Sequence, residues 1–301
     1  MSITDFTEKW CSLSGDAKVV IVTNGDRVTL ANDLQNCIKN KCEILIFAPG
    51  GELMSALVEL SPSDLVIALF GFNTFVFGGA NGIFSPFSKP QGVSAKYAFV
   101  RLGISMESLF EGLSTPKELI YNKIDELRQY KNGTCLRITN DSGTDIALRI
   151  NPFTTCSHEI TADGEMAFLP PSETSSDVIA NNADGRIVAD VTVGQLYHYG
   201  ELLGSFGLVD QPVILTVENG IVVDITGGKM AAELKGKLFS LPAECRELVE
   251  LGHGLSKMTP TGLIGVDESI IDTCHFGIGD GAKCGVHLDV VVNAPTITEV
   301  E

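Results

Sequence analysis

The sequence predicts an α/β amino-terminal domain, built on a parallel sheet with crossover helices, followed by an α+β carboxyl-terminal domain. Two observations predict this arrangement. Short β-branched runs alternate with helical patterns in the first part of the chain, and hairpin signals replace that alternation near residue 133. The length of 301 residues suits two domains, because single cores stop growing with chain length. We place the boundary so that the domains cover residues 1–132 and 133–301.

The amino-terminal strands are predicted at residues 18–25, 43–50 and 64–71, where β-branched runs each end in glycine. Residues 27–40 and 116–130 carry apolar side chains at helical spacing. This order is typical of parallel strands joined by helices, and the carboxyl ends of such strands form a natural ligand crevice. The loops contain neither a GxGxxG dinucleotide fingerprint nor a GxxxxGK phosphate loop.

The carboxyl-terminal part begins with two predicted hairpins. Residues 133–140 and 145–151 flank the turn residues Asp-Ser-Gly, and a second pair of β-rich runs flanks Asn219 and Gly220. Asn-Gly between two such runs is a strong signal for a two-residue turn.

The last 70 residues are predicted to mix helices and strands. Residues 230–251 read as two helical stretches that break at Pro242, and strands return near 274–279 and 285–293. This mixture gives the carboxyl-terminal domain its α+β character.

Composition excludes some classes of protein. The formal net charge of −17, from 21 basic and 38 acidic residues, argues against nucleic-acid binding. The eight cysteines form no CxxC pair and suggest reduced thiols, and the acidic start of the chain does not resemble a signal peptide. An apolar stretch at 66–84 is interrupted by asparagine and glycine, which favours a buried strand and loop over a membrane span. We therefore expect a cytoplasmic, globular protein.

Three of the five histidines lie close together near the carboxyl terminus. His287 and Asp289 are two residues apart on a predicted strand, so their side chains leave the same face. His253 follows a predicted helix and lies between two glycines that allow close backbone approach, and we expect it to supply the third ligand. Two imidazoles and one carboxylate form the facial triad that suits non-haem Fe(II).

Other readings of these residues remain open. His-x-Asp on a strand is often an ordinary hydrogen-bonded pair, and His275 suits a fourth ligand, a residue that orients a ligand, or a substrate acid/base. Tyr197 is a further candidate for proton transfer, while the spacing around Glu165 is unremarkable.

Seven segments, taken in order, carry a resemblance to a known family. They are GTDIALRI (143–150), DGEMAFLPP (163–171), DGRIVADVTV (184–193), VENGIVVDITGG (217–228), ELVELGHG (247–254), DESIIDTCHFGIGDG (267–281) and GVHLDVVV (285–292). This succession resembles the carboxyl-terminal region of the aminopeptidase T-like metalloaminopeptidases, a superfamily that includes the 2,5-dihydroxypyridine 5,6-dioxygenases. The segments cover about half of the chain, and the first 130 residues agree only in their α/β pattern.

The resemblance implies functional roles for particular residues. The glutamate of the family's Gly-Glu motif corresponds to Glu165, the histidine before its glycine-rich segment to His275, and its closing His-x-Asp to His287 and Asp289. Where the aminopeptidases have a glutamate that bridges two metals, this chain has His253. Because neutral imidazole offers one lone pair to one metal, this difference favours the mononuclear iron chemistry of the dioxygenases.

We therefore expect an Fe(II) dioxygenase that acts with O2 on a small aromatic or heteroaromatic diol, with His253, His287 and Asp289 as ligands and with catalytic roles for His275, Tyr197 and Glu165. One alternative is an aminopeptidase or amidohydrolase with Zn or Co, in which Glu165 and His275 join the ligands. A second is a metal-free binding or assembly protein. The expected partners are a small-molecule substrate and a second copy of the chain, with no nucleic acid and no membrane.

Overall fold

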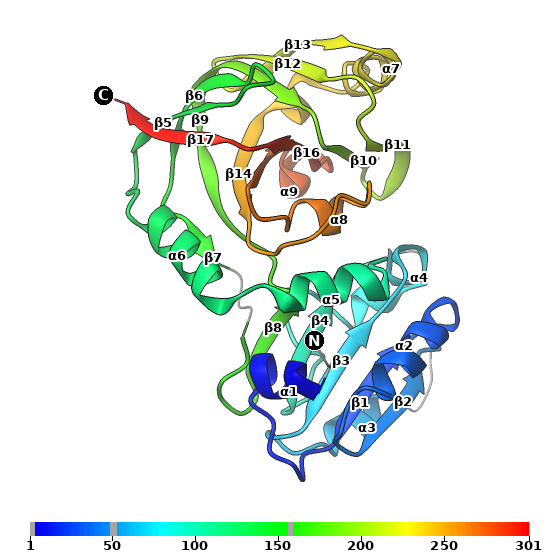
Figure 1. Cartoon of the computed structure of the whole chain (residues 1–301). Coiled ribbons are helices and arrows are strands. Elements are labelled where there is room, and N and C mark those ends of the chain that lie inside the picture. The colour runs from blue at the N-terminus through cyan, green and yellow to red at the C-terminus, as the bar shows by residue number, and fades with distance from the viewer. Residues whose placement is uncertain (1–3, 49–52, 77, 156–158, 301) are drawn as a thin grey trace. The chain divides into compact units, whose positions relative to one another are not determined.

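The structure is a computed structural model that describes residues 4–48, 53–76, 78–155 and 159–300 (Figure 1). The chain divides into two compact units. Unit 1 comprises Met1–Thr115 and Cys156–Ser172, and unit 2 comprises Pro116–Thr155 and Glu173–Glu301. The chain therefore passes between the units three times, and unit 1 is discontinuous in sequence.

Unit 1 is built on a five-stranded parallel sheet with the strand order β2-β1-β3-β4-β8. The central strands β1, β3 and β4 are buried along their whole length, as expected for a sheet with covered faces. The strands are β1 (Val19–Thr23), β2 (Cys42–Ile46), β3 (Leu65–Leu69), β4 (Lys96–Val100) and β8 (Met166–Leu169).

Short helices connect these strands, and apolar side chains from the sheet and the helices form the core of unit 1. Aromatic rings dominate this core, with Phe70 lying 5.1 Å from Phe84 between ring centroids. The helices are α1 (Thr4–Cys11), α2 (Val28–Gln35), α3 (Leu53–Val58), α4 (Phe72–Val76) and α5 (Met106–Ser114), with 3-10 turns η1 (Gly25–Arg27) and η2 (Ala80–Gly82).

Unit 2 consists mainly of antiparallel strands, nine of which follow the order β11-β10-β16-β15-β14-β9-β6-β5-β17. Strands β12 and β13 form a hairpin beside β9, and β7 also pairs with β9. The strands are β5 (Cys135–Thr139), β6 (Asp145–Ile150), β7 (Thr154–Thr155), β9 (Glu173–Ala189), β10 (Thr192–His198), β11 (Glu201–Leu208), β12 (Val213–Glu218), β13 (Ile221–Gly227), β14 (Leu248–Gly254), β15 (Thr273–Ile278), β16 (Leu288–Asn293) and β17 (Thr296–Val300).

One large apolar core fills unit 2, and the alternate residues of most strands contribute to it. Helix α6 adds Leu127 to this core, and α7 adds Ala231, Leu234 and Leu238. The helices and 3-10 turn of this unit are α6 (Lys117–Arg128), α7 (Lys229–Leu238), η3 (Ala243–Arg246), α8 (Ile264–Asp267) and α9 (Gly281–Cys284).

The structure confirms the predicted fold class, an α/β amino-terminal part followed by a sheet-rich carboxyl-terminal part. Both predicted hairpins form, because β5 pairs with β6 and β12 pairs with β13, both antiparallel. Among the described residues, no helix is long and apolar enough to cross a membrane.

Two details differ from the sequence-based expectations. Helix α6, which we placed before the boundary at residue 132, belongs to unit 2 because its apolar face packs into that core. The domain boundary therefore stays a prediction, and the compact units divide the chain elsewhere. The second helical stretch predicted within residues 230–251, the part after Pro242, forms only the 3-10 turn η3 before β14 begins. His253 lies on strand β14 rather than after a helix.

Candidate metal centre

Three neighbouring strands of unit 2 bring two carboxylates to the same face of the sheet. Asp289 on β16 is paired with Gly277 on β15, and Gly277 is paired with Glu250 on β14. Residues that are paired across strands project from the same face, so Glu250 and Asp289 flank a position without a side chain. We call this face of β9, β14, β15 and β16 the metal-site face.

Gly277 leaves the space that these carboxylates and His287 share. A Cβ atom at this position would lie 2.8 Å from Glu250 Cβ, 2.9 Å from His287 Cε1 and 3.2 Å from Asp289 Oδ1. Glycine is therefore the residue that fits here, because any side chain would displace the groups around it.

His287 directs one ring nitrogen at both carboxylates. Its Nε2 atom lies 3.2 Å from Asp289 Oδ1 and 3.4 Å from Glu250 Oε2. Its Nδ1 atom lies 3.2 Å from the carbonyl oxygen of Gly279, which can accept the Nδ1–H hydrogen bond. That bond selects the tautomer in which Nε2 carries the lone pair, the arrangement found in most metal-binding histidines.

Electrostatics favours positive charge at this point. The charge of Asp289 raises the pKa of His287 to about 12. Glu250 adds to this increase, and burial of the imidazole opposes it. For Glu250, burial alone would raise the pKa of the carboxyl group, but the hydrogen bond with His287 and nearby imidazole charges lower it. Two ionised carboxylates therefore face a nitrogen that binds either a proton or a metal ion.

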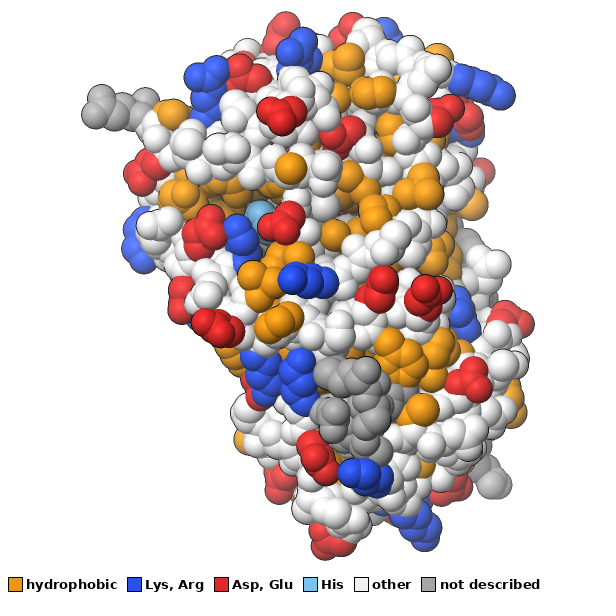
Figure 2. Space-filling view, viewed as in Figure 1, with side chains coloured by type: hydrophobic (Ala, Val, Ile, Leu, Met, Phe, Trp, Pro, Cys, Tyr) orange, Lys and Arg blue, Asp and Glu red, His pale blue; other side chains and the backbone are white. Residues whose placement is uncertain are grey.

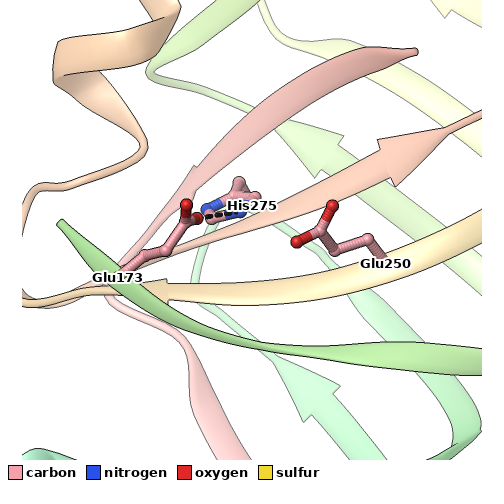
Figure 3. Close-up of side chains that lie close together, drawn as sticks. All are labelled: Glu173, Glu250 and His275. Carbon is pink, nitrogen blue, oxygen red and sulfur yellow. Dashed lines mark ion pairs between the residues drawn. The ribbon is translucent and has the colours of Figure 1, made fainter. Parts of the chain in front are cut away.

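A second cluster shares Glu250 with the first. His275 Nε2 lies 2.9 Å from Glu173 Oε2, and the carboxyl group of Glu250 points toward this pair (Figure 3). The ligand atoms of Glu173, Glu250 and His275 lie within 4.8 Å of one another, as do those of Glu250, His287 and Asp289. Glu250 therefore lies between two groups of candidate ligands.

The position of His275 depends on a second glycine. His275 is paired with Gly252 on β14, and a Cβ atom at residue 252 would lie 2.0 Å from His275 Nε2. The imidazole ring therefore lies over the glycine backbone. Burial lowers the pKa of His275, but the nearby Glu173 carboxylate outweighs this effect and raises it to about 10.

The donor set around His287 fits a divalent cation. Asp289 Oδ1 is buried and, apart from His287 Nε2 at 3.2 Å, has no candidate hydrogen-bond partner among the described residues. Two carboxylates and one imidazole nitrogen are ligands that first-row divalent metals accept. Glu250, His287 and Asp289 are thus the residues best arranged to hold an ion.

Comparison with known proteins identifies the family. The profile of the 2,5-dihydroxypyridine 5,6-dioxygenases matches residues 108–258, which is half of the chain. The chain belongs to this dioxygenase family. The matched region includes Glu173 and Glu250 and ends before His275. A search of curated proteins finds no significant match.

Solved structures agree with the dioxygenase fold. The 2,5-dihydroxypyridine dioxygenase from Pseudomonas putida KT2440 superposes with a TM-score of 0.65 at 16% identity, covering 98% of this chain and 92% of that one. Wild-type AmpT from Thermus thermophilus superposes with a TM-score of 0.59 at 12% identity, covering 99% and 94%. At these identities the likeness shows the shared fold, and the dioxygenase family match indicates an enzyme of the oxygenase type.

In this dioxygenase family member, the structure does not bring His253 together with His287 and Asp289. His253 is paired with Thr174 and Cys274, so its side chain leaves β14 on the face opposite to Glu250. It is 3% exposed, and Cys274 beside it belongs to the apolar core of unit 2. His253 as third ligand therefore stays a prediction that this geometry does not favour, whereas Glu250 lies with His287 and Asp289 on the metal-site face.

Glu165 belongs to unit 1, whereas the residues of the two clusters belong to unit 2. Its carboxylate accepts hydrogen bonds from the backbone amides of Thr161 and Ala162, both at 2.8 Å, and from the Thr161 hydroxyl at 3.1 Å. These hydrogen bonds lower the pKa of Glu165, and the one from the Ala162 amide contributes most. These bonds close a turn before β8, and a catalytic role for Glu165 stays a prediction.

The other two expected catalytic residues lie in unit 2. His275 is on the metal-site face, next to Glu173. Tyr197 is on β10, which pairs with β16, and burial raises the pKa of its phenol group. Catalytic roles for both residues remain predictions.

Sequence reasoning missed Glu173 and Glu250. Glu250 lies in LVELGHG, where period-2 alternation places Glu250, Gly252 and Gly254 on one face and Leu251 and His253 on the other. If this segment is taken as a strand, the alternation predicts that Glu250 and His253 lie on opposite faces. Glu173 begins the 17-residue strand β9, and nothing local to PPSETS distinguishes it from a surface glutamate.

Proposed function

We propose that this protein is a non-haem Fe(II) dioxygenase that cleaves or oxidises a small aromatic or heteroaromatic diol such as 2,5-dihydroxypyridine. The single observation that carries the proposal is the convergence of Glu250, His287 and Asp289 on one point of the metal-site face, in a chain that belongs to a dioxygenase family. The remaining candidate partners are a small-molecule substrate, O2 and a second copy of the chain.

When bound, Fe(II) supplies open coordination positions at which a diol and O2 meet. The residues of this chain then have separate tasks. Glu250 and Asp289 provide negative charge, and the bond from His287 Nδ1 to the Gly279 carbonyl orients the imidazole. Side-chain exposure of 43% for His287 and 13% for Asp289 indicates that the cation position is reached from the His287 side.

The ligand assignment is tested with a pair of variants on neighbouring strands. We expect Asp289→Asn to lose most bound iron and all oxygen uptake, because the amide removes the charge that faces His287 Nε2. His253→Leu is the matched control, and we expect it to retain iron because His253 faces the apolar core. Iron is measured on anaerobically purified protein, and oxygen uptake is measured with 2,5-dihydroxypyridine.

Two results would contradict the assignment. Iron retained by Asp289→Asn would remove Asp289 from the ligand set, and iron lost from a folded His253→Leu protein would restore the original triad. Circular dichroism of both variants separates loss of metal from loss of structure.

A second candidate function is metal-dependent amide hydrolysis at a two-metal centre. The observation that favours it is the position of Glu250 in both clusters, because the two oxygens of one carboxylate can bridge two cations. Metal content discriminates the candidates: one iron per chain supports the dioxygenase, and two zinc or cobalt ions support the hydrolase. In the two-metal case Glu173→Gln reduces the metal content from two ions to one, whereas in the one-metal case it leaves the content unchanged.

A further inference from the structure

The connection between β14 and β15 passes over the metal-site face. This connection spans residues 255–272 and is far longer than a hairpin turn needs. Gly254 ends β14 on the metal-site face, and a Cβ atom there would lie 2.1 Å from the carbonyl oxygen of Ile270. The backbone near Ile270 therefore lies directly over this end of the face. We call residues 255–272 the crossing segment.

A buried carboxylate fastens the middle of the crossing segment. Asp267 is fully buried and accepts hydrogen bonds from the backbone amide of Gly262 at 2.7 Å and from the amide and hydroxyl of Thr261 at 2.8 and 2.9 Å. It also accepts a hydrogen bond from the Thr192 hydroxyl on β10. Thr192 is paired with Val291, which is paired with His275, so Thr192 projects from the metal-site face. The anchor thus holds the crossing segment over that face.

The anchored segment places Ile264 beside Asp289. The next pair after Val193 and Val290 in the antiparallel pairing of β10 with β16 would be Gly194 and Asp289. A Cβ atom at Gly194 would lie 3.1 Å from Ile264 Cγ1 and 3.2 Å from the Asp289 carbonyl oxygen. The side chain of Ile264 therefore fills the space that glycine leaves beside the backbone of Asp289.

This placement adds an apolar side to a centre that is otherwise polar. Glu173, Glu250, His275, His287 and Asp289 all offer charged or polar atoms. On the viewed face of the protein, hydrophobic side chains lie in patches between acidic and basic ones (Figure 2). The hydroxyl groups of a diol suit the polar groups, and the hydrocarbon edge of its ring suits an aliphatic side chain.

We propose that Ile264 is a specificity-determining residue, whose side chain limits the bulk of the ring that can lie beside Asp289. The inference rests on the proposed function, because it needs a diol at the metal centre. Asp267 acts as a positioning residue. It fixes the crossing segment, so that the Ile264 side chain stays in place and selects diols by the size of their ring. A single small ring fits such a site, and a diol with a fused second ring on the Asp289 side binds more weakly.

The test measures binding rather than turnover. Protein loaded with Fe(II) is titrated anaerobically with 4-nitrocatechol, followed by its visible spectrum, and with 2,3-dihydroxynaphthalene, followed by fluorescence. We expect Ile264→Ala to weaken 4-nitrocatechol binding by about tenfold, the loss expected when roughly two methylene contacts disappear. The same variant should bind the naphthalene diol more tightly than the wild type does.

Two further variants complete the design. Ile264→Phe fills the same space and should lose the naphthalene diol while retaining iron, which keeps the test informative if the alanine variant is unstable. Ile297→Ala removes a partly buried isoleucine on β17 and should bind both probes as the wild type does.

Unchanged ratios of the two dissociation constants in both Ile264 variants overturn the inference. A wild-type protein that holds iron but binds neither diol overturns the proposed function instead, and the inference with it.

Discussion

At the scale of single residues, His253 shows how burial can dominate an imidazole. Its side chain faces the core of unit 2, and its Nδ1 atom lies 3.1 Å from the Gly254 carbonyl oxygen. Burial, with a smaller contribution from the charge of Lys123, lowers the pKa of His253 to about 4. The folded protein therefore keeps this residue neutral over a pH range in which the unfolded chain would protonate it.

This depressed pKa gives a prediction for acid stability. The unfolded chain binds the proton near pH 6.5 and the folded chain only near pH 4, so stability is fully present above pH 6.5 and falls as the pH drops toward 4. The loss amounts to about 3 kcal/mol from this one residue. Urea unfolding between pH 7 and 4, with a chelator present, measures it.

His253→Leu should remove that part of the pH dependence, because leucine has no proton to bind. Leu251→Met, a substitution of a buried apolar residue on the same strand that has no ionisable group, serves as the control and should leave the slope as it is in the wild type. An unchanged slope in His253→Leu would show that other groups cause the loss of stability in acid.

Some residues of the candidate metal centre could be predicted from the sequence, and others could not. His287 and Asp289 were predicted as a pair, because residues two apart on a strand share a face and the structure places their atoms 3.2 Å apart. His253 was grouped with this pair because its glycine neighbours suggested a loop, whereas the register of β14 turns its side chain toward the core. Glu173 joins the site because β9 pairs with β14, where its partner Gly254 lies 81 residues further along the chain, and no local pattern can encode such a pairing.

At the scale of elements, strands with local partners were predictable and strands with distant partners were not. The β5–β6 and β12–β13 hairpins follow from turn residues and β-branched runs beside them. Strand β9 pairs with β6, β7, β12 and β14, and its polar residues gave no regular alternation from which to predict it. Its length follows from tertiary pairing rather than from local preference.

Strand β14 offers a test of the glycine on which His275 lies. We expect Gly252→Ala to destabilise the protein by about 1–3 kcal/mol, because the added methyl group displaces the imidazole from Glu173. Gly265→Ala is the control, since that glycine has open space around it and lies in α8. Urea unfolding at pH 7 compares them, and equal stabilities would show that His275 moves aside at little cost.

At the scale of the whole molecule, a bound cation would link strands that are distant in sequence. Glu250 belongs to β14, and Asp289 belongs to β16, with β15 between them in the sheet. A ligand that binds only the folded chain stabilises it by about 2.7 kcal/mol at a concentration of one hundred times its dissociation constant. We therefore expect anaerobic Fe(II) to raise the thermal unfolding temperature, and chelation to reverse the change.

Asp289→Asn should abolish this thermal shift, and His253→Leu should preserve it. Differential scanning fluorimetry under nitrogen measures both. A shift of equal size in Asp289→Asn would mean that the stabilising ion binds elsewhere on this acidic chain, whose net charge is −17.

The route of the chain between the two units has a consequence for dissection. Residues 156–172 return to unit 1 and place β8 beside β4, with Leu169 fully buried, before the chain enters unit 2 again. A fragment ending at Thr115 would expose one side of β4, and a fragment starting at Pro116 would carry β8 without its sheet. Neither unit can be cloned as one uninterrupted stretch, so protein engineering must excise β8 and rejoin the ends, or retain the entire polypeptide.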